Sequence, residues 1–133
     1  MGEIANGAKP LILVVDDIFE IGQAVMMALE SEGYEVETAL DAPEALMIAA
    51  RRLPDLVVCD VNLPSMLGWE LCGKLKSLAL PKALPVIMLT AKTAEVDEMR
   101  SYEMSADDHF TKPPNFELLL AAVARHLAAN GRL

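Results

Sequence analysis

The chain has 133 residues, 53% of them apolar, and its 20 acidic side chains outnumber 11 basic ones, which gives a formal net charge of −9 at pH 7. This length suits one domain whose core needs no metal or disulfide support. The surplus of negative charge would repel phosphates, so we expect no direct contact with nucleic acid. With 2 cysteines, Cys59 and Cys72, neither a disulfide framework nor a structural zinc site is expected.

The beginning of the sequence carries no signal for secretion or membrane insertion. Residues 1–10 have no basic start followed by a long apolar stretch, and the apolar run 11–15 stops at two aspartates. We therefore predict a cytoplasmic protein without membrane contact. Residues 1–10 and 131–133 are expected to be tails on either side of one domain over 11–130.

The first part of the chain alternates strand patterns with helix patterns. A buried strand is predicted over 11–15, and a helix follows over about 19–32 with Gly33 as its C-terminal cap. The alternating segment 34–39 is typical of a more exposed strand near the sheet edge. Asp41, three residues before Glu44, then predicts a variant capping box at the start of a helix that Pro54 ends.

The rest of the chain continues this alternation. A buried run over 56–59 ends at Asp60, a helix follows over 69–80 with Leu71, Leu75 and Leu78 on its apolar face, and a third buried run over 86–89 ends at Thr90. We expect a polar helix over 95–104, a short strand over 109–111, and a last helix capped by Asn115. Such alternation predicts an α/β fold, a parallel sheet covered by helices on both faces.

Polar residues follow the predicted strands at the edge where open parallel sheets bind ligands. They are Asp16, Asp17, Asp60, Thr90 and Lys112. If the first and third strands are neighbours, Asp16 or Asp17 lies beside Asp60, and the repulsion between these carboxylates requires a cation. Oxygen ligands with room for water favour Mg²⁺. A carboxylate there can attack phosphorus, provided that Mg²⁺, the Thr90 hydroxyl and the Lys112 ammonium neutralise the transferred group.

The pattern from residue 11 to residue 127 resembles the receiver domain of bacterial two-component response regulators, which is CheY-like. The resemblance rests on Asp16-Asp17, on Asp60 with Leu63-Pro64 and Gly68 behind it, on Thr90-Ala91 and on Lys112-Pro113. It implies that 11–130 is a receiver domain with a doubly wound, flavodoxin-like fold. The five-stranded parallel sheet would have the order 2-1-3-4-5 and five flanking helices.

The resemblance also implies the chemistry of the site. Asp60 would be the phosphoacceptor, and Mg²⁺ would be bound by Asp17 and Asp60, by the backbone carbonyl of Asn62, and by Asp16 mostly through water. Lys112 would pair with the phosphoryl group, placed over the site by a cis bond to Pro113. Thr90 would move toward that group.

Partners and activity follow from the same resemblance. The donor would be a sensor histidine kinase or a histidine phosphotransfer protein, and the activity would be limited to self-phosphorylation and autodephosphorylation. Phosphorylation would change the face of the fourth helix, fifth strand and fifth helix. The output would be a downstream effector protein or an output domain from which this receiver was excised. We expect a monomer or a weak phosphorylation-dependent dimer.

Three other functions are considered. The first is a degenerate receiver that acts as a scaffold through phosphorylation-independent contacts. The second is an aspartyl-phosphate phosphatase or phosphotransferase, but Asp60-Val61-Asn62 lacks the second acid of a D-x-D motif. The third is a flavodoxin-like cofactor binder, against which the absence of a phosphate-cradling Ser/Thr/Gly loop after Val15 counts.

The sequence departs from the receiver pattern at a few positions. His109 stands where receivers usually carry Tyr or Phe, so Thr90 and His109 would form the switch, and an imidazole could make it depend on pH. Leu67 replaces a common polar residue, Ser105 a common glycine and Pro114 a common aromatic residue. These changes bear on partner contacts and local turns, whereas the predicted phosphorylation site is intact.

Overall fold

The computed structural model describes residues 9–64, 66–90 and 106–133. Its five parallel strands form one sheet in the order β2-β1-β3-β4-β5, which confirms the predicted order. The strands are β1 (Leu11–Val15), β2 (Glu35–Ala39), β3 (Leu56–Asp60), β4 (Val86–Thr90) and β5 (Asp108–Thr111).

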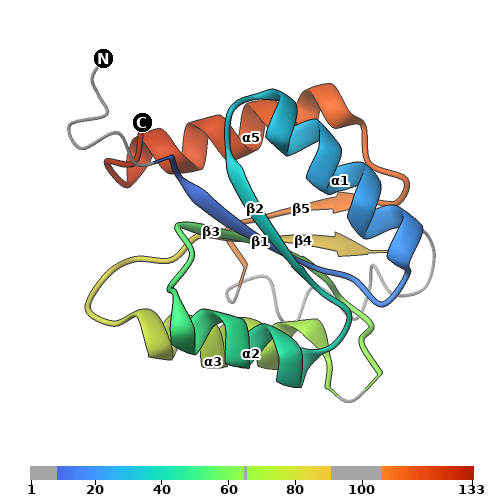
Figure 1. Cartoon of the computed structure of the whole chain (residues 1–133), viewed down its shortest axis with the longest axis vertical. Coiled ribbons are helices and arrows are strands. Elements are labelled where there is room, and N and C mark those ends of the chain that lie inside the picture. The colour runs from blue at the N-terminus through green and yellow to red at the C-terminus, as the bar shows by residue number, and fades with distance from the viewer. Residues whose placement is uncertain (1–8, 65, 91–105) are drawn as a thin grey trace.

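Helices cover both faces of this sheet (Figure 1). On one face lie α1 (Phe19–Ser31) and α5 (Phe116–Ala129), and on the other lie α2 (Ala42–Arg51) and α3 (Gly68–Ala79). The helix predicted over 95–104 falls outside the described residues. The α/β architecture is therefore confirmed with four helices in the described part of the chain.

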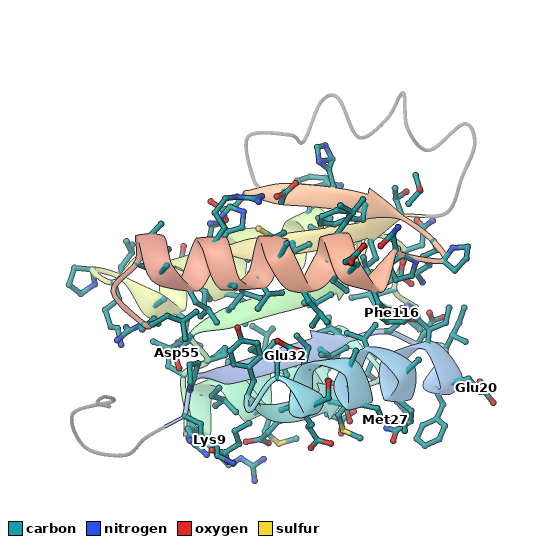
Figure 2. The ribbon with its side chains drawn as sticks, turned by 90° about the horizontal axis from the view of Figure 1, so that it is seen from above. Lys9, Glu20, Met27, Glu32, Asp55 and Phe116 are labelled. Atoms are coloured by element: carbon teal, nitrogen blue, oxygen red, sulfur yellow. The ribbon has the colours of Figure 1, made fainter. Side chains whose placement is uncertain are left out.

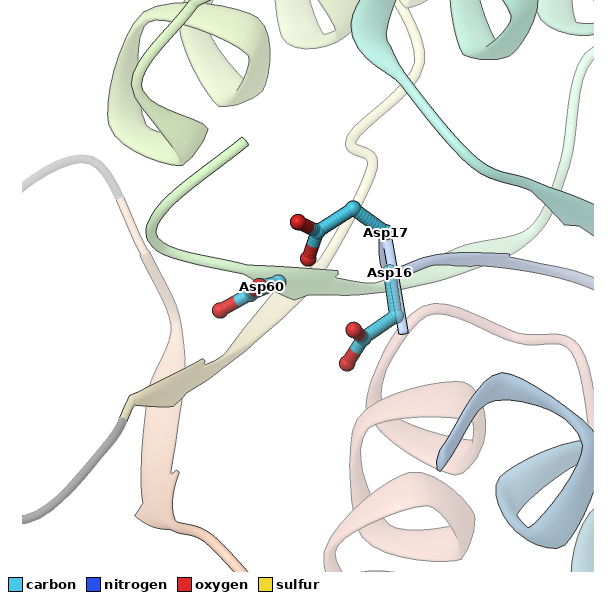
Figure 3. Close-up of side chains that lie close together, drawn as sticks. All are labelled: Asp16, Asp17 and Asp60. Atoms are coloured by element: carbon cyan, nitrogen blue, oxygen red, sulfur yellow. The ribbon is translucent and has the colours of Figure 1, made fainter. Parts of the chain in front are cut away.

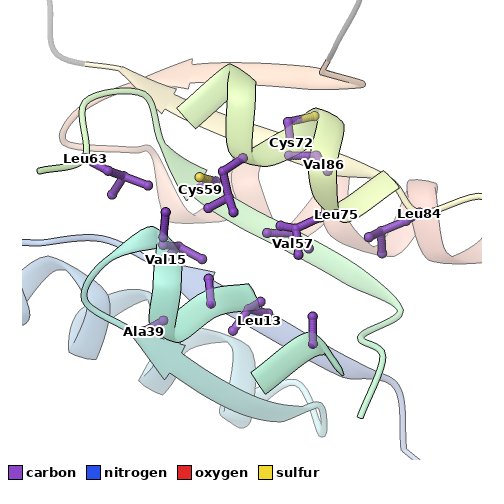
Figure 4. Packing of buried hydrophobic residues seen from close by; sticks show 14 of the residues in the cluster. Leu13, Val15, Ala39, Val57, Cys59, Leu63, Cys72, Leu75, Leu84 and Val86 are labelled. Carbon is purple, nitrogen blue, oxygen red and sulfur yellow. The ribbon is translucent and has the colours of Figure 1, made fainter. Parts of the chain in front are cut away.

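The buried strands divide the apolar core into two layers. Leu13, Val57 and Cys59 pack toward α2 and α3 (Figure 4), whereas Ile12 and Val58 pack toward α1 and α5. All residues of β1, β3 and β4 are buried, as their continuous apolar runs predict. The edge strand β2 is only partly buried.

Two helix starts follow the predicted capping pattern. The Asp41 carboxylate accepts a hydrogen bond from the Glu44 N–H at 2.9 Å, and the Glu44 carboxylate accepts one from the Leu40 N–H at 2.9 Å. The second bond thus reaches one residue further than in the usual box. The Asn115 side chain accepts from the Leu118 N–H at 3.1 Å.

One predicted apolar face is wrong in part. Leu71 and Leu75 of α3 are fully buried, but Leu78 is 46% exposed. Cys72 and Ala79 complete the buried face instead. At 100° per residue, Leu78 lies at the margin of the face that Leu71, Cys72, Leu75 and Ala79 form, where the helix surface begins to turn toward solvent.

Asp55 connects the start of β1 to the residues that follow α5. Its carboxylate accepts a hydrogen bond from the Leu11 N–H at 2.8 Å and lies 3.1 Å from Nε of Arg132. Asp55 is at the opposite end of the molecule from Phe116, the first residue of α5 (Figure 2). No helix in the described residues is long and apolar enough to cross a membrane.

Candidate functional site

Three carboxylates meet at the carboxyl end of β1 and β3. Val15, the last residue of β1, pairs in parallel with Cys59 of β3. The residues that follow them in the sequence, Asp16 and Asp60, therefore lie at the same edge of the sheet. One oxygen atom from each of Asp16, Asp17 and Asp60 lies within 4.8 Å of the others (Figure 3). Asp16 and Asp60 are buried, with 2% and 6% of their surface exposed, and Asp17 is exposed to solvent. Both residues of the Asp16-Asp17 pair therefore belong to the cluster.

The two oxygens of Asp16 differ in their contacts: Oδ1 accepts a hydrogen bond, whereas the buried Oδ2 accepts none and has an ion-pair contact only. Oδ1 accepts a hydrogen bond from the Ile18 N–H at 2.9 Å, just before the first turn of α1. Oδ2 lies 2.9 Å from Nζ of Lys112. Asp16 thus holds the start of α1 through Oδ1, while the Lys112 ammonium lies against Oδ2.

Lys112 is held over the cluster by the end of β5. Its N–H donates to the Thr90 carbonyl at 2.7 Å, and its bond to Pro113 is cis, as the resemblance implies. The ammonium lies 2.9 Å from Asp16 and 3.2 Å from Asp60. Although burial alone would lower it, the pKa of Lys112 is raised by these two carboxylates, so the side chain stays charged.

The electrostatic balance of the cluster favours an added cation. Burial, with a smaller contribution from the Asp16 charge, raises the pKa of Asp60 to about 6, although Lys112 opposes the shift. One ammonium therefore does not compensate the carboxylates fully. The donor set consists of oxygen atoms only, which fits a hard ion such as Mg²⁺.

The loop after Asp60 begins with the predicted carbonyl ligand. The Asn62 N–H donates to Oδ1 of Asp60 at 3.3 Å, and Asn62 also forms an isolated antiparallel bridge with Leu67. At the same place the Gly68 N–H donates to the Val61 carbonyl at 2.5 Å. The loop thus leaves β3 and comes back to the end of the same strand, and these two contacts close it.

The two predicted switch residues lie on neighbouring strands. Thr90 ends β4 and is 4% exposed, next to β3, which ends at Asp60. His109 is in the edge strand β5, paired with Met88, and its side chain is exposed. The positions of all the predicted site residues are thus described, and Asp16, Asp17, Asp60 and Lys112 meet directly, whereas His109 lies apart in β5.

One polar cluster between β5 and α5 could not be foreseen. Oδ2 of Asp108 lies 2.8 Å from the Arg125 guanidinium and 3.3 Å from Nε2 of His126. These residues are far apart in the sequence, and no periodic pattern connects a strand residue to the last turn of a later helix. The place of His126 near the end of α5 indicates an interaction with the helix dipole, but it does not indicate this contact with Asp108.

Comparison with known proteins identifies the family of the chain. The family model for the response regulator receiver domain matches residues 12–124. The chain therefore belongs to the response regulator receiver domain family. It is 42% identical to the response regulator PleD of Caulobacter vibrioides over 84% of this chain and 25% of that protein. It is 46% identical to the alkaline phosphatase synthesis transcriptional regulatory protein PhoP of Bacillus subtilis over 77% of this chain and 42% of that protein.

Solved structures show the same fold over nearly their whole length. A CheY-like receiver domain protein from Methanospirillum hungatei superposes with a TM-score of 0.83 at 32% identity, covering 94% of this chain and 98% of that one. TrrA from Thermotoga maritima, solved in complex with Mg(2+)-BeF, gives a TM-score of 0.77 at 32% identity, covering 89% and 99%. In contrast, the chain spans less than half the length of PleD and PhoP.

Proposed function

We propose that this chain is a phospho-accepting receiver in which Asp60 takes a phosphoryl group from a sensor histidine kinase or a histidine phosphotransfer protein. The observation that carries the proposal is the cluster of Asp16, Asp17 and Asp60, with the Lys112 ammonium against two of its members. Membership of the receiver family supports it, and so does the Mg(2+)-BeF complex of the relative TrrA. The receiver unit is taken as residues 11–130.

The proposed reaction is a phosphoryl transfer between a nitrogen and an oxygen. An ionised oxygen of Asp60 attacks the phosphorus of a phosphohistidine, the P–O bond forms as the P–N bond breaks, and the departing imidazole nitrogen takes up a proton. Negative charge builds up on the oxygens of the transferred group, and the ammonium of Lys112 and the hydroxyl of Thr90 stabilise it. Autodephosphorylation reverses the modification: water attacks phosphorus, phosphate leaves, and the Asp60 carboxylate is restored.

The residues present fit a bound Mg²⁺. Asp17, Asp60 and the Asn62 carbonyl would bind it directly, whereas Asp16 would act mostly through water because its two oxygens already contact Ile18 and Lys112. The ion would supply positive charge that screens the phosphoryl oxygens from the attacking carboxylate. Its removal by a chelator is therefore expected to stop phosphorylation.

The response is proposed to involve Thr90 and His109. A phosphoryl group carries about 1.5 to 2 negative charges in place of the single charge of the Asp60 carboxylate, and Thr90 next to it would shift a pre-existing equilibrium that includes the exposed side chain of His109. The reader of this change would be a downstream effector protein or an output domain. A phosphorylation-dependent dimer would be weak.

The test is labelling by a small phosphodonor in the presence of Mg²⁺. We expect one acid-stable, base-labile phosphoryl group per chain by intact mass spectrometry, and none for Asp60→Asn. Asp55→Asn, which changes a carboxylate at the opposite end of the molecule, is the matched control and should be labelled like the wild type. Equal labelling of wild type and Asp60→Asn would overturn the assignment, and no labelling of the wild type would favour the phosphorylation-independent scaffold.

A further inference from the structure

We propose that Gly68 is a positioning residue for the metal-binding segment 60–62. Because it has no side chain, the start of α3 can rest directly on the backbone of Asp60, and this contact sets the direction of the Asn62 carbonyl. The inference rests on the proposed function, since that function makes this carbonyl a ligand of Mg²⁺.

The space beside Gly68 excludes even one carbon atom. A Cβ added there would overlap the carbonyl oxygen of Asp60 and lie 2.9 Å from Cα of Val61, closer than real Cβ atoms come to such neighbours. Both neighbours are backbone atoms, so no side-chain rotation can relieve the overlap. Among the glycines that the structure describes, Gly33 and Gly131 have a positive φ and Gly68 does not. Glycine is thus needed at position 68 for space and not for its backbone angles.

The strand side of this contact cannot move away. Asp60 pairs with Leu89 in β4, and the Val61 N–H donates to the Leu89 carbonyl at 3.0 Å. β3 lies between β1 and β4 and is fully buried. A side chain at position 68 must therefore displace the other partner, which is the first turn of α3 with the loop residue Leu67 before it.

Displacing Gly68 breaks the contacts that close the loop. The Gly68 N–H bonds the Val61 carbonyl at 2.5 Å, and Asn62 is bridged to Leu67 directly beside it. The peptide units on either side of Asn62 take their orientation from these contacts. When Gly68 moves, the Asn62 carbonyl turns, while the carboxylates of Asp16 and Asp17 stay in place on β1. Groups that orient metal ligands in this way typically change metal affinity about 10- to 100-fold when lost.

A second glycine of α3 provides the matched control. Gly73 is exposed, and a Cβ added there meets nothing within 4 Å. Gly73→Ala therefore makes the same chemical change in the same helix without touching the loop. Asp55→Ala is the control for lost stability alone, because Asp55 holds Leu11 and Arg132 at the opposite end of the molecule.

The experiment is a Mg²⁺ titration of the full chain, followed by the fluorescence of Trp69, the only tryptophan. We expect Gly68→Ala to weaken Mg²⁺ binding about 10- to 100-fold, whereas Gly73→Ala and Asp55→Ala bind like the wild type. Labelling of Gly68→Ala by a small phosphodonor should be slow at low Mg²⁺ and recover as the Mg²⁺ concentration rises. Asp55→Ala, which loses stability alone, should be labelled like the wild type at low and at high Mg²⁺.

The outcomes separate this inference from the proposed function. Equal Mg²⁺ affinity of wild type and Gly68→Ala overturns the role of Gly68 alone, whereas a wild type that binds no Mg²⁺ overturns the proposed function and this inference with it. Urea unfolding monitors the fold. If Gly68→Ala is unstable, it can be combined with Gly73→Ala, which should stabilise α3 because alanine favours an exposed helix position more than glycine does. A chain that fails to fold in both backgrounds contradicts the inference, because the contact would then be a requirement of the fold.

Discussion

In the proposed reaction Asp60 must be ionised to attack phosphorus, yet its surroundings shift its carboxyl group toward the protonated form. Only 6% of its surface is exposed, and burial raises the pKa of its carboxyl group to about 6, above the ordinary value of 3.8. Lys112 limits the rise, and a bound Mg²⁺ would limit it further. The acidic cluster is therefore a place where the chain keeps unfavourable charge that only a ligand can compensate fully.

This shift predicts how stability depends on pH without metal. Because the folded state binds the Asp60 proton more tightly than the unfolded chain, its contribution falls as pH rises from about 4 to about 6. Asp60→Asn should thus gain stability relative to wild type, by about 1 to 3 kcal/mol more at pH 7.5 than at pH 4. Urea unfolding in a chelator at both pH values measures this difference. A difference that does not change with pH would contradict the assigned shift.

Which residues gather at this edge of the sheet could be predicted from their places at strand ends, but their contacts could not. An aspartate after a buried strand indicates which edge of the sheet it occupies. It does not show that Asp16 is buried against Lys112 while Asp17 faces solvent. That difference depends on how α1 begins at Ile18 and on how β5 delivers Lys112, and both are tertiary contacts.

At the scale of elements, β5 connects the site to the edge of the sheet. Its last residue, Thr111, pairs with Thr90, and the next residue, Lys112, reaches the carboxylates. Two residues before Thr111, His109 presents an exposed side chain. A change at Thr90 can therefore pass along a strand that carries both the site lysine and the proposed switch.

This arrangement predicts that the imidazole of His109 senses phosphorylation. The chain has 2 histidines, so their ring signals can be followed by NMR and assigned with His126→Gln. We expect the His109 signal to shift when Mg²⁺ and a small phosphodonor are added, and to stay unchanged in Asp60→Asn. If the wild type is labelled and its His109 signal does not move, His109 has no part in the switch. Repeating the titration between about pH 6 and pH 8 shows whether the switch depends on its protonation.

Elements with strong local patterns could be predicted, and those that depend on packing could not. The apolar runs of β1, β3 and β4 and the cap at Asn115 are confirmed. The exposure of Leu78 and the extension of β5 to Asp108 differ from the prediction. Asp108 joins β5 through its register with Ile87 and its contact with α5, neither of which the local sequence encodes.

At the scale of the whole molecule, the candidate site and the contacts of Asp55 lie at opposite ends of the sheet. The carboxyl end holds the acidic cluster, and the other end holds the contacts of Asp55 with Leu11 and Arg132. The parallel direction of the strands produces this separation. The strand order, which brings β1 beside β3, follows from the family resemblance, because hydrophobic periodicity alone does not determine which strands are neighbours.

We expect Asp55→Ala to destabilise the chain without affecting the site. It removes a hydrogen bond to the start of β1 and a half-buried ion pair, which together contribute about 1 to 2 kcal/mol. Urea unfolding measures the loss, and a Mg²⁺ titration should give the wild-type affinity. Glu35→Gln, which weakens an exposed pair with Arg52, is the control and should cost less. A fall in Mg²⁺ affinity for Asp55→Ala would show that the two ends are coupled.

The proposed function requires that the phosphoryl group reside on one particular carboxylate. Labelling the chain with a small phosphodonor and Mg²⁺, reducing the acyl phosphate with borohydride and sequencing the peptides by mass spectrometry identifies that residue directly. We predict that homoserine appears at position 60 and that Asp16 and Asp17 remain aspartate. Modification at another residue, or none at position 60, would contradict it.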